Sequence, residues 1–265
     1  MTPDSPKKEC DSIMDKDHDT TLLRREFESF HGYWNIDLDD LLMADPRYFA
    51  SYDRLLRVTS GRGNLTPRER ELICIAVAGQ VTYLNQAATS HHIRQAKRWG
   101  ASDEEIVETL QLAASLGVHS MLIGVPLAHE VFQELGLSAS VSDEDLDDYR
   151  RDLKDRFIAD RKYWSPHWDT VLAYTPEYFE AYLDLSSIPW NHGTLDESFK
   201  ELIYVAIDVV TTHLFTAGIR THVKKAIEYG ATPDQVIDVM SLASNIGVDT
   251  VLAGVSQIPR GAGTR

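Results

Sequence analysis

Two stretches of this 265-residue chain decide its fold: residues 71–84, ELICIAVAGQVTYL, and residues 201–215, ELIYVAIDVVTTHLF. Apolar residues cover almost every side of a helix built from either stretch, so both predict helices buried in a core. When Glu71 is placed over Glu201, the two stretches match without a gap at an offset of 130 residues. Such a match indicates an internal duplication.

The offset of the two stretches persists on both sides of them. It pairs Tyr33-Trp34 with Tyr163-Trp164, Pro46 with Pro176, Tyr48-Phe49 with Tyr178-Phe179, His92 with His222, Gly100-Ala101 with Gly230-Ala231, and Gly117-Val118 with Gly247-Val248. Chance similarity would not hold one offset over roughly a hundred residues. We therefore predict an all-α chain of two tandem helical units that form an internal pseudo-dimer. The expected parts are a disordered tail (1–20), a first repeat (21–138), a charged junction (139–156) and a second repeat (157–265).

Capping residues at matching places support helices in both repeats. Asp45 and Thr175 each precede a proline, which favours the first turn of a helix. Thr66 and Ser102 are each followed three residues later by glutamate, the pattern of a capping box. No segment alternates apolar and polar residues for long, so no strand is expected.

The composition excludes several classes of function. The formal net charge of −15 would repel phosphate backbones, so no nucleic-acid partner is expected. No uninterrupted apolar run approaches the ~18 residues of a membrane span, and no membrane partner is expected. The two cysteines, Cys10 and Cys74, show no CxxC or metal-ligand spacing. These features favour a reduced, cytoplasmic setting.

The pattern of the repeats resembles the carboxymuconolactone decarboxylase and alkylhydroperoxidase D superfamily. The resemblance rests on Glu71-Leu-Ile, His92, Ala96, Gly100-Ala-Ser-x-x-Glu105-Ile and Gly117, and on Glu201-Leu-Ile, His222, Ala226, Gly230-Ala-Thr-x-x-Gln235-Val and Gly247 in the second copy. It implies the all-α fold of that family and assembly into a symmetric homo-oligomer. Because a tandem chain corresponds to a fused dimer, three chains would match the family's hexamers, so a trimer is favoured.

Family members that act as thiol peroxidases carry CxxCxxxH. Here the two cysteine positions hold Asn85 and Ala88 in the first repeat, and Phe215 and Gly218 in the second. Without a thiolate pair there is no nucleophile and no disulfide exchange, so thiol peroxidase activity is disfavoured.

The resemblance to decarboxylases without these cysteines implies a lyase or isomerase that acts on a small carboxylated metabolite without a cofactor. Histidine can carry the proton that such enol chemistry needs. The second repeat is richer in polar residues, because Asp208 and His213 replace Ala78 and Tyr83. We expect proton transfer by His222 and His213, with Asp208 orienting one of them. His92 is a further candidate from the first repeat.

We expect Arg220 to bind the substrate carboxylate, with Thr212 and Tyr83 as further substrate-binding residues. Each histidine among these residues could instead be structural, and Asp208 could be tied to a helix end. The adjacent His91 and His92 point in different directions on a helix, and neither HxxxH nor HExxH occurs, so no metal site is expected. A non-catalytic binding or oligomerisation module that retains the fold is the alternative function.

Overall fold

The computed structural model describes residues 19–258, and every regular element in that range is helical. The disordered tail expected at residues 1–20 lies almost wholly outside the described residues. Contacts divide the chain into two compact units: residues 66–243, and residues 1–65 together with 244–265.

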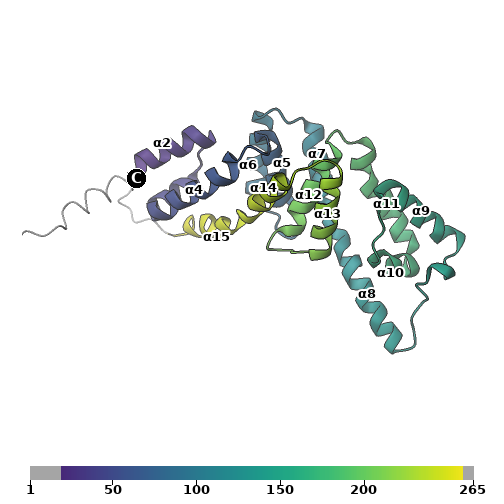
Figure 1. The fold of residues 1–265 in the computed structure, drawn as a ribbon. Helices are drawn as coiled ribbons and strands as arrows, with labels where there is room; N and C mark the ends of the chain where they lie inside the picture. Colours follow the sequence, from purple (N-terminus) through teal and green to yellow (C-terminus); the bar gives the residue numbers. More distant parts are fainter. Residues whose placement is uncertain (1–18, 259–265) are drawn as a thin grey trace, which may run out of the picture. The chain divides into compact units, whose positions relative to one another are not determined.

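The smaller unit contains four described helices (Figure 1). They are α2 (Thr20–His31), α3 (Ile36–Ala44), α4 (Pro46–Gly61) and α15 (Ile246–Val255). α15 comes from the end of the second repeat but packs on α3 and on the buried core around Phe27 and Phe49.

The larger unit holds the central helices of both repeats. From the first repeat come α5 (Pro67–Gly79), α6 (Gln86–Arg98), α7 (Asp103–Ala114), the short 3-10 helix η1 (Ser115–Val118) and α8 (His119–Glu134). A short 3-10 helix η2 (Asp143–Asp145) follows, and then α9 (Asp148–Arg161), α10 (His167–Tyr174), α11 (Pro176–His192), α12 (Glu197–Val209), α13 (Thr216–Glu228) and α14 (Pro233–Ser244).

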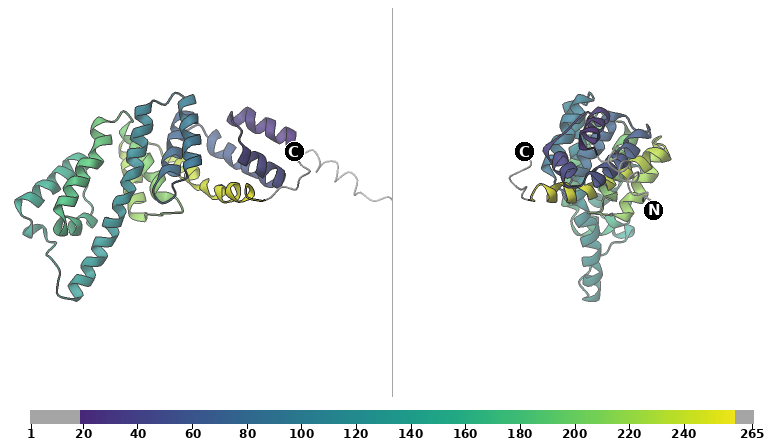
Figure 2. Two further views of the ribbon diagram at one scale, coloured as in Figure 1. Left: turned by 180° about the vertical axis from the view of Figure 1, so that it is seen from behind. Right: turned by 90° about the vertical axis from the view of Figure 1, so that its left-hand side faces the viewer.

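The repeats exchange helices, which explains why the compact units do not coincide with the repeats. α8 of the first repeat packs against α10 of the second (Figure 2). Val118 and Leu122 share a core with Leu153 and Phe157. Within the larger unit, Thr82 and Thr212 lie at equivalent positions, and their hydroxyl oxygens are 3.2 Å apart. An internal pseudo-dimer predicts such a contact, because equivalent residues of the two repeats meet near its pseudo-two-fold axis.

The charged junction expected at 139–156 is only partly a linker. From Asp148 onward the chain is helix α9, and its Leu153 is fully buried. The charged residues of this segment lie mainly on the exposed side of α9, and the opposite side of the helix packs in the core. The number of charges along the sequence does not reveal this division into two sides.

Three of the four helix caps predicted from the sequence are present in the structure. The hydroxyls of Thr66 and Ser102 accept N–H bonds from Glu69 and Glu105, and both capping boxes are complete. Asp45 caps α4 as predicted. Thr175 makes no side-chain cap, so that prediction was wrong, although Pro176 occupies the first turn of α11.

A buried ion pair fixes the beginning of α12. Lys200 Nζ lies 3.1 Å from Glu108 Oε1, and both side chains are 4% exposed. The other oxygen of Glu108 accepts the backbone N–H bonds of Thr194 and Leu195, at 2.6 and 3.0 Å. Removal of either charge would leave the other unpaired in the core. The pair therefore anchors α12, which carries Glu201 and Asp208.

Two helical stretches, Asp103–Glu134 and Pro233–Val255, are long and apolar enough to cross a membrane by length and composition, with mean hydropathies of 1.5 and 1.4. This is weak evidence, because core helices of soluble proteins meet the same criteria.

Candidate functional site

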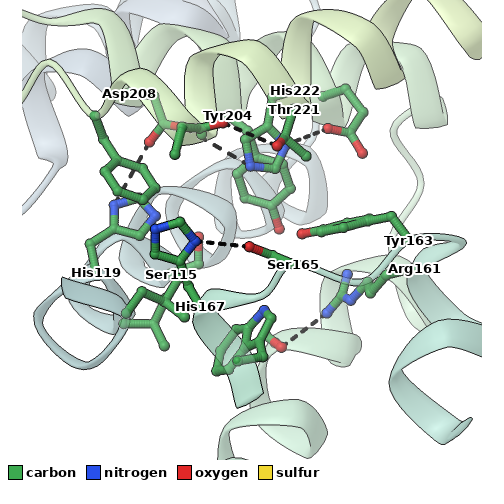
Figure 3. A pocket seen from close by; sticks show the side chains of 18 of the residues that line it. Ser115, His119, Arg161, Tyr163, Ser165, His167, Tyr204, Asp208, Thr221 and His222 are labelled. Atoms are coloured by element: carbon green, nitrogen blue, oxygen red, sulfur yellow. Dashed lines mark hydrogen bonds and ion pairs between the residues drawn. The ribbon is translucent and has the colours of Figure 1, made fainter. Parts of the chain in front are cut away.

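A cavity of about 90 Å³ lies within the larger unit, between α8, α11, α12, α13 and the segment that follows α9. Its polar wall is shown in Figure 3 and includes Ser115, His119, Arg161, Tyr163, Ser165, His167, Tyr204, Asp208, Thr221 and His222. Aromatic side chains supply much of the remaining lining. The cavity therefore combines aromatic surfaces with many polar side chains, and its wall is more polar than that of most small-molecule sites.

His222 is held by a buried carboxylate. Its Nδ1 lies 2.6 Å from Glu201 Oε2, and Glu201 is 4% exposed. An ionised carboxylate only accepts hydrogen bonds, so Nδ1 donates and Nε2 is left on the other side of the ring. Burial lowers the pKa of His222, but the hydrogen bond and charge of Glu201 outweigh it and raise the pKa overall. The ring is thus oriented as a proton carrier.

Asp208 lies on the Nε2 side of this histidine. Its Oδ2 is 4.0 Å from His222 Nε2, and the residue is 1% exposed. Oδ2 has no hydrogen-bond partner among the described residues. Burial raises the pKa of Asp208 to about 7; the charge of His222 lowers it and that of Glu201 raises it. The carboxyl can therefore carry a proton near neutral pH.

Gly218 makes room for this carboxyl. A Cβ at position 218 would lie 2.0 Å from Asp208 Oδ2, closer than real atoms approach. Position 218 corresponds to the second cysteine of the CxxCxxxH motif, which thiol peroxidases of the family that this chain resembles carry. Asp208 in its observed position and a side chain at 218 therefore exclude one another, which gives a physical reason for the absence of a cysteine there.

His119 and His213 meet beside Asp208. His119 Nδ1 lies 2.7 Å from His213 Nε2 with parallel rings, and 3.8 Å from Asp208 Oδ1. These three donor atoms lie within 4.8 Å of one another, a spacing that a metal ion could bridge. Two nitrogens bound to one tetrahedral ion at about 2.0–2.1 Å would be roughly 3.3 Å apart. The observed 2.7 Å is instead that of a hydrogen bond in which one imidazole donates to the other.

His92 has the same carboxylate partner in the first repeat but not the same surroundings. Its Nδ1 lies 2.8 Å from Glu71 Oε2, and the two side chains are 26% and 21% exposed. Ala78 stands where the second repeat has Asp208. His92 does not line the cavity. The Glu–His pair is therefore common to both repeats, whereas the buried acid is particular to the second.

Of the residues expected from the sequence, the cavity wall brings together His222 and Asp208, and His213 lies directly behind His119. Arg220 lines a separate, open groove on α13. Tyr83 accepts a hydrogen bond from Asn85, and Thr212 contacts Thr82. Neither of these two side chains reaches the cavity.

Sequence reasoning missed the roles of three residues at this site. These residues are Glu201, His119 and Arg161. The signal for Glu201 is present in the repeat, because Glu71–His92 and Glu201–His222 share a spacing of 21 residues. Arg161, the cation in the wall, has no local motif.

The sequence profile of the Carboxymuconolactone decarboxylase family matches residues 46–125 and residues 176–255. Together these matches cover more than half of the chain. The chain belongs to the carboxymuconolactone decarboxylase family. The expected fold and duplication are thereby confirmed.

A solved structure of the same kind supports this membership. A candidate gamma-carboxymuconolactone decarboxylase subunit from Burkholderia xenovorans, whose crystal structure extends to 1.70 Å, is 34% identical. The match covers 90% of this chain and 95% of that one, with a TM-score of 0.86. None of the curated proteins matches this chain.

The raised pKa of Asp208 predicts a pH-dependent gain of stability on replacement. A carboxyl that titrates near 7 when folded and near 3.8 when unfolded destabilises the fold as pH rises between those values. Asp208→Asn keeps the shape without the charge, so we expect it to melt above the wild type at pH 8, with a much smaller difference at pH 4.5. Thermal unfolding followed by circular dichroism at both pH values measures this. Equal shifts at both pH values would contradict the buried, proton-binding carboxyl.

Proposed function

We propose that this protein is a decarboxylase-like lyase or isomerase that acts on a small carboxylated metabolite by proton transfer from His222. The observation that carries the proposal is the arrangement of this ring: Glu201 holds Nδ1 at 2.6 Å, and Nε2 faces a largely aromatic cavity with the second acid, Asp208, 4.0 Å away. A carboxylate behind a histidine and an acid in front of it are suited to general acid–base catalysis.

The proposed chemistry needs only one mobile proton. In a decarboxylation, the bond to the leaving CO₂ breaks and its electron pair stays on the substrate carbon. His222 then gives its Nε2 proton to that carbon, while Glu201 stabilises the imidazolium that precedes the transfer. In an isomerisation the same nitrogen takes a proton from one carbon and returns it to another. Asp208, whose Oδ2 lies 4.0 Å from Nε2, would return a proton to His222 between turnovers when the two groups move within hydrogen-bond distance.

The test is turnover in D₂O with a panel of small unsaturated and cyclic carboxylic acids. We expect at least one acid to release CO₂, or to be rearranged, with one deuterium on the carbon that receives the proton, as seen by NMR and mass spectrometry. No CO₂ release and no deuterium incorporation with any acid would contradict the proposal. Such a result would favour the non-catalytic binding module.

Catalysis without a metal or another cofactor, a cytoplasmic location and a trimer of chains stay predictions from the sequence.

A further inference from the structure

Arg161 is the one arginine or lysine of the cavity wall, and it has no carboxylate partner among the residues that the structure describes. It ends α9, its Nη2 donates to Ser186 Oγ at 2.9 Å, and its guanidinium lies 5.4 Å from the centre of the Trp190 ring. No ion pair formed between residues 19 and 258 includes it. Other basic residues without an ion pair, such as Arg94 and Arg220, are exposed, whereas Arg161 is half-buried.

The first repeat indicates what is missing. At the offset of 130 residues, Arg161 corresponds to His31, and Leu183 corresponds to Asp53. His31 Nε2 lies 2.9 Å from Asp53 Oδ1, so the basic group of the first repeat is paired inside the protein. Leu183 is 1% exposed and belongs to the apolar core. The second repeat therefore keeps a basic group at this position but has lost the internal anion that would pair with it.

A half-buried cation without a counter-ion is stabilised when an anion reaches it from outside. The cavity gives an anion access to Arg161, because this side chain lies in the cavity wall beside Tyr163. In Figure 3, Arg161 and Tyr163 lie on the right, and Asp208 and His119 lie on the left. The planar fork of a guanidinium matches a carboxylate in two parallel hydrogen bonds.

The surface beside Arg161 is aromatic. The rings of Trp190 and Tyr204 are nearly parallel, 6.3 Å apart between centres, and the Tyr204 ring lies 4.7 Å from that of His222. A planar ligand along these rings would extend from the guanidinium toward the His222–Asp208 end of the cavity. Flat unsaturated groups pack well against aromatic faces.

We infer that Arg161 is the anchor for the carboxylate of an aromatic or otherwise unsaturated ligand, whose body lies along Trp190 and Tyr204 and whose far end reaches His222. This inference rests on the proposed function only in taking the cavity as the substrate site. It assigns to Arg161 the role that the sequence suggested for Arg220, which lines the open groove on α13.

The experiment measures binding, not turnover. Benzoate, cinnamate and sorbate are titrated into the full-length protein, with tryptophan fluorescence and calorimetry as readouts, alongside benzamide as the uncharged analogue of benzoate. We expect at least one carboxylate to bind saturably, and benzamide to bind at least about 10-fold more weakly than benzoate. Arg161→Met should weaken carboxylate binding by roughly 10- to 100-fold, and Arg161→Lys by less, because lysine keeps the charge without the fork.

Arg156→Met is the matched control. Arg156 lies on the same helix and pairs with Glu180 and Asp184 at the surface, so its loss should leave binding unchanged. Circular dichroism verifies that each variant is folded; if Arg161→Met does not fold, Arg161→Lys and the benzoate–benzamide comparison still decide.

Three outcomes would overturn the inference: no saturable binding of any of the three carboxylates at millimolar concentration, equal binding of benzamide and benzoate, or wild-type affinity in Arg161→Met. Loss of binding in Arg220→Met alone would transfer the role to that residue. Arginine-dependent binding without turnover in D₂O would leave the inference standing and count against the proposed chemistry. Turnover that does not depend on Arg161 would support the proposed chemistry and count against the inference.

Discussion

Replacing His222 with alanine is expected to lower turnover by roughly 10²–10⁴-fold, the usual contribution of general acid–base catalysis. The reason is that Nε2 of His222 is the nitrogen that faces the cavity, while Nδ1 is already occupied by Glu201 at 2.6 Å. The loss should appear in kcat and in deuterium incorporation. Melting measurements should show a folded protein, although removal of the ring leaves Glu201 without its partner.

His92→Ala is the comparison that distinguishes the two repeats. It removes the same kind of ring from the same kind of carboxylate, Glu71 at 2.8 Å, but outside the cavity. We expect a stability change of similar sign and a much smaller loss of turnover. If His92→Ala abolishes turnover and His222→Ala leaves it unchanged, the site has been assigned to the wrong repeat.

Gly218→Ala is expected to destabilise the protein by about 1–3 kcal/mol and to impair turnover strongly, because overpacking forces neighbouring groups to move. The added Cβ would meet Asp208 Oδ2 at 2.0 Å and Phe215 Cδ1 at 2.6 Å. Urea unfolding followed by circular dichroism measures the stability loss. Gly124→Ala is the control: Gly124 lies within α8 with open space around the new atom, so that variant should be neutral or slightly stabilised.

A double-mutant cycle identifies the obstacle. If Asp208 is the group that the new Cβ displaces, Gly218→Ala should cost much less in an Asp208→Ala background, and the difference is the coupling between the two sites. Additive effects of the two substitutions would show that Phe215 alone resists the added atom. That result would remove the physical link between Asp208 and the absence of a cysteine at position 218.

The sequence determined the helices and their duplication, because both depend on local or repeated signals. All-round apolar patterns at 71–84 and 201–215 predicted the core helices α5 and α12, although these helices end at Gly79 and Val209, before the predicted stretches do. The boxes at Thr66 and Ser102 predicted helix starts that the structure confirms. Asymmetry between the repeats drew attention to Asp208, which does line the cavity. A polar residue in an apolar helix is costly, so its position in the sequence carries information.

Only the tertiary structure decided which residues share a site. α8 of the first repeat packs on α10 of the second, and this places His119 next to His213, 94 positions further along the chain. Arg161, at the end of a charged helix, reaches the cavity because that helix packs in the same core, whereas Arg220 faces an open groove. Helix periodicity determines which side of a helix is buried, but the partner that covers it is chosen by packing between segments distant in sequence.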